Sequence, residues 1–285
     1  MYYRLERNRK QITKRTFMCL IVFAYQAHKK FPLLVAANRD EFYDRATEAS
    51  HFWPDKPDLL AGRDGFASGT WLGISKRGRF AAITNGINSK SSHIKKFSRG
   101  SLAVDFLGSE VSANQYAREV RSQARNFNGF HLIVYDMKSM CYVDSDSNIL
   151  SQEICQLSPG IYGLSNAGIC SDWPKCEIGK NKMSEIINSD SFNFKDLTKV
   201  ISSRKLASKN QLKKLGLCEK KDVLLSGQFV STENYGTRCS TLVSISSKQK
   251  VNWLEKSFDS SRKLTDSIYK TFDLKINSSS KIPDE

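Results

Sequence analysis

The sequence predicts an α+β fold built from layers of strands and helices, and three observations support this class. Short apolar runs of strand length come at both ends of the chain. Segments with the spacing of apolar residues that is typical of helices cluster in the middle. No change of composition, proline-rich linker or internal repeat divides the chain, so a single domain is the economical interpretation.

The first strands are expected in pairs. Each pair consists of two apolar runs separated by a short polar segment, as in a hairpin. The runs are CLIVFAY (19–25) with LLVAAN (33–38), and WLGIS (71–75) with RFAAIT (79–84). The second pair flanks Lys76-Arg77-Gly78, which has the composition of a tight turn.

The middle of the chain is expected to be mostly helical, and strands return at its end. Helices are predicted over 102–107, 112–127, 174–190 and 194–208, and the third follows Pro174, a residue favoured in the first turn of a helix. A hairpin is predicted from GFHLIVYD (129–136) and MCYVDS (140–145). The last strands are expected at 240–246, 251–257 and 268–274, before a tail that should fray.

The formal net charge of +15 comes mainly from residues 1–17 and 204–221. Neither segment contains a zinc finger, a helix-turn-helix or an aromatic-interleaved recognition module. We therefore expect general attraction to anionic surfaces, including peripheral attraction to membranes, and no specific nucleic-acid binding. No apolar run approaches the roughly 18 residues of a transmembrane helix, so no transmembrane segment is expected.

The seven cysteines are expected to be mostly buried free thiols. The chain has no signal peptide with an apolar core, which favours a cytoplasmic, reducing environment. Cys170 and Cys176 are the closest pair, with five residues between them and no histidine nearby. Zinc-binding pairs are spaced by two to four residues and repeated, so no metal site is expected.

Polar residues gather at the ends of four predicted strands, where a rigid strand would hold a side chain in a cleft. The stretches are ANRDEFYDR (37–45), ITNGIN (83–88), YGLSNAG (162–168) and NYGTRCST (234–241). Each of the last three, taken alone, also fits an ordinary turn rich in asparagine and glycine. The first places Arg39, Asp40, Glu41 and Arg45 together, and a solvated charged run is its alternative reading.

Taken together, these stretches carry a family resemblance. MCLIVFAY, VAANRDEF, GTWLGISKRGRFAAITN, NGFHLIVYD, YGLSNA and YGTRCST resemble, in order, the NRDE family, also called the transport and Golgi organisation family of the second type. More distantly, the layout is similar to the cysteine branch of the N-terminal nucleophile hydrolases, which includes bile-salt and penicillin V acylases. That resemblance implies a four-layer αββα sandwich.

The resemblance to the acylases also implies catalytic roles. Cys19 would be the nucleophile, activated by its own α-amine if it were the first residue, because that amine has a pKa of about 8. Arg39 would stabilise the thiolate and Asp40 would hold the ammonium. Asn85 and Asn166 would donate to an oxyanion, and Arg238 would orient the nucleophile or a substrate carboxylate. The expected ligand-binding residues are Asn38, Glu41, Arg45, Thr70 and Trp71.

The chain departs from the family pattern in three places. Ser68-Gly69 stands where the family has two glycines, and Cys239 stands where it has serine or threonine. The third departure is residues 1–17, which precede the usual Met-Cys start at Met18. We expect them to be a mis-assigned start, a targeting segment or a genuine extension, followed by one domain over 18–275 and a flexible tail over 276–285.

The resemblance leaves two functions open. Binding of nucleic acid is a third hypothesis and the weakest of the three. The first is the handling of a hydrophobic anionic ligand, because the family is linked to intracellular haem mobilisation and to lipid or acyl-coenzyme A handling. No cofactor is required, and haem would be non-covalent cargo, since no Cys-x-x-Cys-His motif is present. The second is hydrolysis of an amide or thioester by Cys19, which requires Cys19 to be N-terminal.

Overall fold

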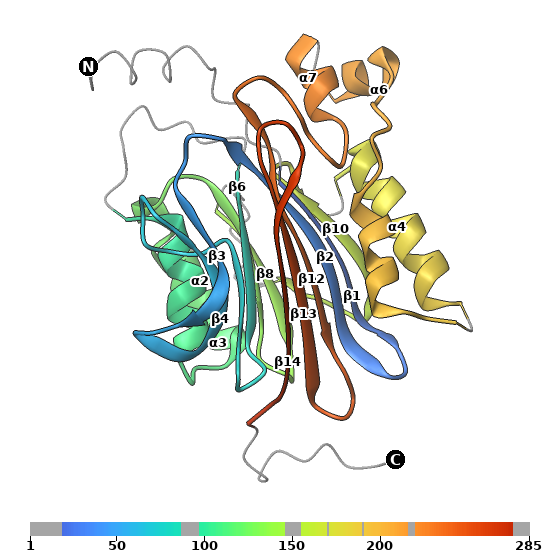
Figure 1. The fold of residues 1–285 in the computed structure, drawn as a ribbon. Helices are drawn as coiled ribbons and strands as arrows, with labels where there is room; N and C mark the ends of the chain where they lie inside the picture. Colours follow the sequence, from blue (N-terminus) through green and yellow to red (C-terminus); the bar gives the residue numbers. More distant parts are fainter. Residues whose placement is uncertain are drawn as a thin grey trace.

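The computed structural model describes residues 19–86, 97–145, 155–169, 171–189, 191–215 and 220–275. Within these ranges, two antiparallel sheets pack face to face, and helices cover both outer faces (Figure 1). The expected four-layer αββα arrangement is therefore confirmed. The segments 1–17 and 276–285, expected to be separate from the domain, lie outside the described residues, as does Cys170.

The first sheet contains the N-terminal hairpin and the C-terminal strands in the order β11-β10-β1-β2-β12-β13-β14. The strands are β1 (Leu20–His28), β2 (Phe31–Phe42), β10 (Gly160–Ser165), β11 (Gly168–Ile169), β12 (Tyr235–Ile245), β13 (Lys250–Phe258) and β14 (Leu264–Asp273). The apolar stretch of β1 is buried on both faces from Leu20 to Tyr25, because one face meets the second sheet and the other meets helices. This explains its continuous run of apolar residues.

The second sheet follows the chain order from β3 to β9. Its strands are β3 (Thr47–Trp53), β4 (Lys56–Asp64), β5 (Leu72–Ser75), β6 (Phe80–Asn85), β7 (Phe130–Tyr135), β8 (Met140–Asp144) and β9 (Cys155–Gln156). Neighbouring strands pair antiparallel, which suits the short connections between them.

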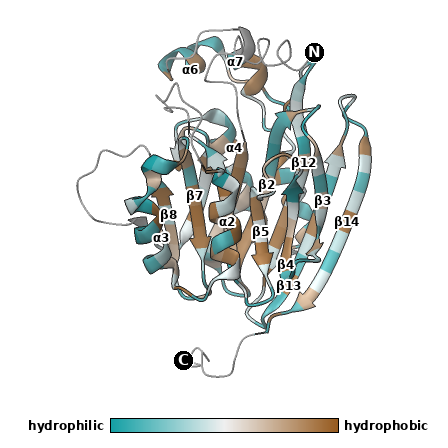
Figure 2. Cartoon of the chain, turned by 90° about the vertical axis from the view of Figure 1, so that its left-hand side faces the viewer, coloured by the Kyte–Doolittle hydropathy of each residue, from teal (hydrophilic) through white to brown (hydrophobic). Residues whose placement is uncertain are grey.

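Helices divide into two groups, one on each outer face. The helices α2 (Arg99–Gly108) and α3 (Ala113–Ser122) cover the second sheet and are followed by the short η1 (Ala124–Asn126); Figure 2 shows α2 and α3 in front of its apolar strands. The first sheet is covered by α4 (Pro174–Ile187), η2 (Phe194–Leu197) and α5 (Thr198–Ile201), with α6 (Lys209–Lys214) and α7 (Lys220–Leu225) above. Three apolar cores therefore lie between the four layers.

Most predicted elements are present in the structure, several with shifted ends, and the main differences are the following. The helix predicted over 194–208 ends at Ile201, and residues 202–208 continue without helix as far as Ser208, whose side chain caps α6. The hairpin β3–β4 and the strand β10 were not predicted. The stretch around Arg238, for which a turn was the alternative interpretation, lies inside β12, so its side chains have the fixed directions of a strand. No helix among the described residues is long and apolar enough to span a membrane.

Candidate functional site

A cavity of about 150 Å³ lies where the ends of strands from both sheets meet the start of α2. Seven residues proposed from the sequence contribute to its wall: Cys19, Arg39, Asp40, Glu41, Arg45, Thr70 and Trp71. Asn85, at the end of β6, is an eighth. These residues are distant in sequence, and the fold brings them together around one space.

Cys19 lies directly before β1, and strand pairing fixes its position. Leu20 of β1 pairs with Asn38 of β2, so Cys19 stands beside Arg39. The Cys19 thiol is 3.8 Å from the backbone oxygen of Asp40 and donates to it. Burial, reinforced by the negative charge of Asp40, raises the pKa of Cys19 to about 12. With residue 18 attached, the sulfur is therefore a neutral thiol at physiological pH, which is a poor nucleophile.

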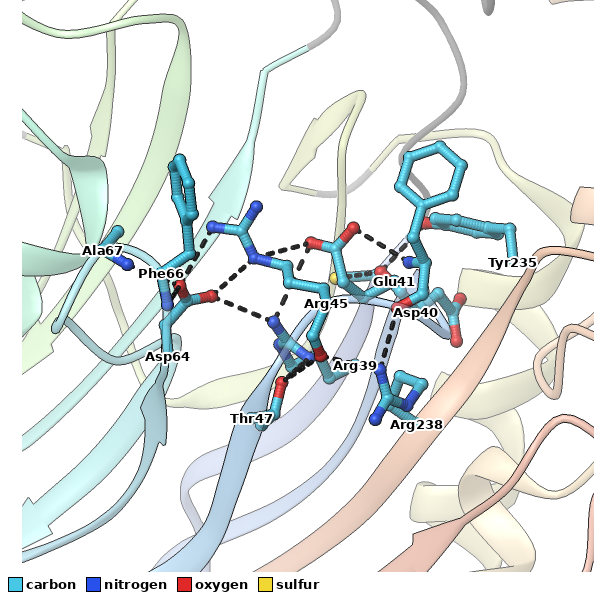
Figure 3. A network of polar contacts seen from close by, with 12 residues as sticks. Arg39, Asp40, Glu41, Arg45, Thr47, Asp64, Phe66, Ala67, Tyr235 and Arg238 are labelled. Atoms are coloured by element: carbon cyan, nitrogen blue, oxygen red, sulfur yellow. Dashed lines mark hydrogen bonds and ion pairs between the residues drawn. The ribbon is translucent and has the colours of Figure 1, made fainter. Parts of the chain in front are cut away.

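Two of the cavity arginines share one carboxylate (Figure 3). Asp64 accepts from Arg39 Nη2 at 3.2 Å, and from Arg45 Nε and Nη2 at 2.7 and 3.0 Å. Glu41 lies further away, at 3.8 Å from Arg39 and 3.7 Å from Arg45. The guanidinium of Arg39 also stacks on the indole of Trp71 at 4.4 Å. Both arginines are thus held by the protein itself.

The run Asn38-Arg39-Asp40-Glu41 is divided between the two faces of β2, because successive side chains of a strand point in opposite directions. Arg39 and Glu41 point to the cavity between the sheets. Asn38 points to the helices, where its amide donates to the carbonyls of Ile201 at 2.9 Å and Gln228 at 2.7 Å. The sequence predicted that Asn38 binds the ligand, whereas the structure gives this side chain no place in the cavity wall.

Asp40 lies at the border of the cavity and the helix-facing core. Its Oδ1 accepts from the Thr237 hydroxyl at 2.7 Å, while its buried Oδ2 has no partner among the described residues. Burial raises the pKa of Asp40 to about 7, although the cation of Lys175 opposes this shift. A buried carboxylate oxygen without a donor is costly, so this atom is suited to receive a cation or a proton.

Asn166 and Arg238 support the cavity from outside its wall. The Asn166 amide donates to the backbone oxygen of Asn85 at 2.7 Å. Arg238 donates to the carbonyls of Phe42 at 2.8 Å and Arg45 at 3.0 Å, and so fixes the turn that carries Arg45. Neither side chain contributes to the cavity surface. The structure therefore gives both a positioning geometry instead of the direct contacts expected from the sequence.

Two charged residues of the cavity wall were missed from the sequence, Asp64 and Arg99. Arg99 is the first residue of α2, and Ser98, Arg99 and Gly100 all line the cavity. Burial lowers the pKa of Arg99 to about 10, which leaves it charged at neutral pH. Its guanidinium donates to the carbonyl of Gly129 at 3.1 Å, and no carboxylate of the described residues forms an ion pair with it. The signal in the sequence was Ser98 before an apolar helical run, an ordinary helix start.

The electrostatic balance of the cavity is even. Three guanidinium groups (Arg39, Arg45 and Arg99) face three carboxyl groups (Asp40, Glu41 and Asp64). Since the pKa of Asp40 is raised to about 7, this carboxyl is partly protonated at neutral pH and the balance shifts towards positive charge. Among the described residues, no group of histidine, cysteine and acidic side chains is placed to hold a metal ion.

Comparisons with known proteins find relatives over most of the chain. The Transport and Golgi organization protein 2 homolog of Bos taurus is 36% identical over 182 residues, covering 60% of this chain and 64% of that protein, so less than two thirds of its length is matched. The Mus musculus homolog is 34% identical over 192 residues, covering 63% of this chain and 68% of that protein. The Drosophila melanogaster protein is 21% identical over 260 residues, covering 84% and 92%.

Solved structures with similar folds include two hydrolases. A variant of conjugated bile acid hydrolase from Clostridium perfringens has a TM-score of 0.45 and 13% identity, covering 91% of this chain and 99% of that chain. A Caenorhabditis elegans ortholog of N-acylethanolamine-hydrolyzing acid amidase has a TM-score of 0.41 and 11% identity, covering 79% and 92%.

The family itself is decided by the sequence match. A family model described as Transport and Golgi organisation 2 matches residues 18–260, which is well over half of the chain. The match begins at Met18, directly before the cavity cysteine, and includes every residue of the cavity wall. The resemblance inferred from the motifs is thereby confirmed, and the chain belongs to the Transport and Golgi organisation 2 family.

Proposed function

We propose that the chain binds the anionic group of an acyl conjugate, such as an acyl-coenzyme A, in the cavity at Cys19. The observation that carries this proposal is the state of Arg99. Arg39 and Arg45 share Asp64, whereas Arg99 is a half-buried cation that, among the described residues, donates to the backbone carbonyl of Gly129 and pairs with no carboxylate. The N-terminal end of α2 lies at the same wall, and helix N-termini favour bound anions.

The size of the cavity favours an anionic head group over a large rigid cargo. Ligand pockets that enclose drug-sized molecules have volumes of roughly 300–1,000 Å³. The present cavity, at about 150 Å³, suits a carboxylate, a phosphate or a thioester with its chain outside. Haem, the other cargo considered for this family, would have to bind with most of its ring outside, through its propionates. Haem is therefore the comparison ligand in the experiment.

The test is titration of the purified chain with palmitoyl-coenzyme A and, separately, with hemin, followed by calorimetry. Replacement of Arg99 by glutamine should weaken binding of palmitoyl-coenzyme A about 10- to 100-fold, because a hydrogen bond to a charged group contributes about 1.5–3 kcal/mol. Arg125→Gln is the matched control, because Arg125 is exposed and makes the same change of net charge away from the cavity.

The two variants separate specific binding from general attraction to a basic protein. Equal weakening by Arg99→Gln and Arg125→Gln would contradict a binding site at α2. Saturable binding of hemin without binding of palmitoyl-coenzyme A would contradict an acyl conjugate as the ligand and point to haem instead. No saturable binding of either would refute the proposal.

A second candidate function, hydrolysis of an amide or thioester, is favoured by a separate observation. The thiol of Cys19 lies in the cavity wall next to Asp40, whose Oδ2 has no partner among the described residues. The negative charge of Asp40 already acts on Cys19, since it raises the pKa of the thiol. If Cys19 were the first residue, the same charge would stabilise an ammonium at its α-nitrogen.

In that form, the α-amine would take the proton of the thiol, and the sulfur would attack the acyl carbon to form a thioester. The ammonium would then protonate the leaving amine or thiol, and water would hydrolyse the thioester to release a carboxylic acid. The side chain of Asn85, at the end of β6 in the same wall, is the nearest proposed donor for the oxyanion. With residue 18 attached, no α-amine is present and the thiol stays protonated.

The test compares the full chain with a chain begun at Met18, from which methionine removal exposes Cys19. Incubation with palmitoyl-coenzyme A should give a palmitoyl adduct and free acid only with the shorter chain, measured by intact mass and by thiol release. Replacement of Cys19 by alanine in the shorter chain should abolish both signals while binding persists. Turnover by the full chain, or none by a shorter chain proven to begin at Cys19, would contradict this mechanism.

A further inference from the structure

Strand β14 is an edge strand with an unusual exposure. One side of β14 pairs with β13, and its other side forms the outer edge of the first sheet (Figure 2). Eight of its ten residues, Leu264–Asp273, are exposed; Ile268 and Phe272 are intermediate. Leu264 and Tyr269 are about half exposed, at 48% and 52%. Among the described residues, no strand pairs with the outer side of β14. A long edge of this kind with exposed apolar side chains is a template for pairing with another strand.

We propose that β14 pairs antiparallel with β14 of a second copy of this chain, around a two-fold axis at Ile268, so that two first sheets join into one continuous sheet. The observation that identifies a second copy as the partner is the order of residues in β14 itself. When two copies of β14 run antiparallel, the residues at its centre meet residues of suitable type in the other copy. A two-fold dimer requires such self-complementarity.

The geometry of a two-fold axis limits the possible registers. An axis perpendicular to the sheet keeps each side chain on its own face, so facing residues must be equally distant from a central residue. Around Ile268, Asp266 faces the partner's Lys270, and Lys270 faces the partner's Asp266. Both pairs are therefore of opposite charge, and directly opposed side chains in antiparallel strands lie close enough to interact.

The remaining pairs in this register also match in character. Ile268 faces the partner's Ile268, and Ser267 faces the partner's Tyr269. The pairing of β14 with β13 is irregular between Leu264 and Asp266, so the register is defined by residues 266–270. Within this segment, apolar and charged residues each meet a residue of suitable type.

The neighbouring registers are unfavourable. An axis at Ser267 places Ile268 opposite the partner's Asp266, and an axis at Tyr269 places it opposite the partner's Lys270. An axis at Asp266 or Lys270 places that charge opposite its own copy. Like charges directly opposite each other destabilise a pair of strands, and a charge opposite Ile268 finds no partner. The register at Ile268 avoids both arrangements.

The dimer is expected to be weak and to depend on protein concentration. One strand from each copy buries less surface than a standard stable interface of about 1,600 Å². The net charge of +15 on each chain adds repulsion between copies, which physiological salt reduces. Sedimentation of the full chain over a wide concentration range should therefore show a monomer–dimer equilibrium.

Exchange of the charges provides the sharpest test. By symmetry, Asp266→Lys alone or Lys270→Asp alone puts like charges opposite each other twice, and each should weaken dimerisation about tenfold or more. The combined variant Asp266→Lys/Lys270→Asp restores both pairs with unchanged net charge, and should dimerise like the natural chain. Lys209→Asp, on exposed α6, is the control for the charge change of Lys270→Asp.

Cross-linking tests the register. In the proposed dimer, Ile268→Cys brings two thiols together at the axis, within the Cα separation of about 4.4–6.8 Å that a disulfide allows. Oxidation should link two chains through this position. Thr265→Cys is the control, because its two copies lie six residues apart along the strands, about 20 Å. A monomer at every concentration, failure of the charge exchange to restore dimers, or equal cross-linking at both positions would overturn the proposal.

Discussion

At the scale of single residues, buried carboxyl groups make the stability of the fold depend on pH. Glu255 of β13 is 2% exposed. Its two oxygens accept from the backbone N–H of Ser50 at 2.8 Å and from the Thr241 hydroxyl at 2.9 Å. Burial raises the pKa of Glu255 above its ordinary value of 4.5, although these hydrogen bonds oppose the shift. The folded chain therefore binds a proton at Glu255 more tightly than the unfolded chain.

We predict that Glu255→Gln gains stability relative to the natural chain as the pH rises from 5 to 8. The natural chain loses unfolding free energy over the range between the unfolded and folded pKa values of Glu255, because the folded state holds more protons there. Glutamine does not titrate, and its amide still reaches both partners. Urea unfolding at several pH values measures this difference.

The matched control is Glu233→Gln at an exposed position, for which the pH dependence should equal that of the natural chain. If the stability curves of Glu255→Gln and the natural chain run parallel between pH 5 and pH 8, the raised pKa of Glu255 is refuted.

At the scale of elements, Arg79 joins the second sheet to the helix that begins at the cavity. It stands directly before β6 and is 7% exposed. Its guanidinium donates to the backbone oxygen of Phe106 at 2.9 Å, to the hydroxyl of Ser109 at 3.1 Å and to the backbone oxygen of Val111 at 2.6 Å. These acceptors lie at the C-terminal end of α2, where carbonyls lack partners within the helix. One side chain thus fixes the position of α2 on the sheet.

We predict that Arg79→Met lowers the free energy of unfolding by about 1–3 kcal/mol, because the backbone oxygen of Val111 loses its donor and that of Phe106 keeps only the donors of Ser109. Arg77→Met is the control, since Arg77 also contacts the end of α2, at the Gly108 carbonyl and Glu110, but through exposed contacts that should contribute less than about 1 kcal/mol. Denaturant unfolding measures both. Arg79→Lys should recover only part of the loss, because a single ammonium does not reproduce the guanidinium fork. Equal losses at positions 77 and 79 would contradict the role given to Arg79.

At the scale of the whole molecule, the sequence predicts the central strands of the sheets well and the strands at the sheet edges poorly. β1 is buried on both faces, so its apolar run is visible without structure. The hairpin β3–β4 escapes prediction because β3 mixes buried and half-buried positions, and its alternation is weak. β14 begins four residues before its predicted start, because exposed polar residues carry no burial signal.

The candidate site shows the same division. Cys19, Arg39 and Asp40 were predictable because they follow or precede apolar strands and belong to a specific motif. The position of Arg99 depends on how α2 packs against β5 and β6, which no local pattern records. The separation of Asn38 from the cavity follows from strand alternation, but only once the register of β2 between β1 and β12 is known.

That alternation has a consequence for the interpretation of natural variants. Substitutions at Asn38 remove hydrogen bonds to the helix layer, so their harm should appear as low cellular abundance of the protein. Substitutions at Glu41, which faces the cavity, should leave abundance near normal and impair the ligand binding proposed for this cavity. A genetic screen scored only by phenotype would merge these classes, although chemical chaperones could rescue one of them and not the other.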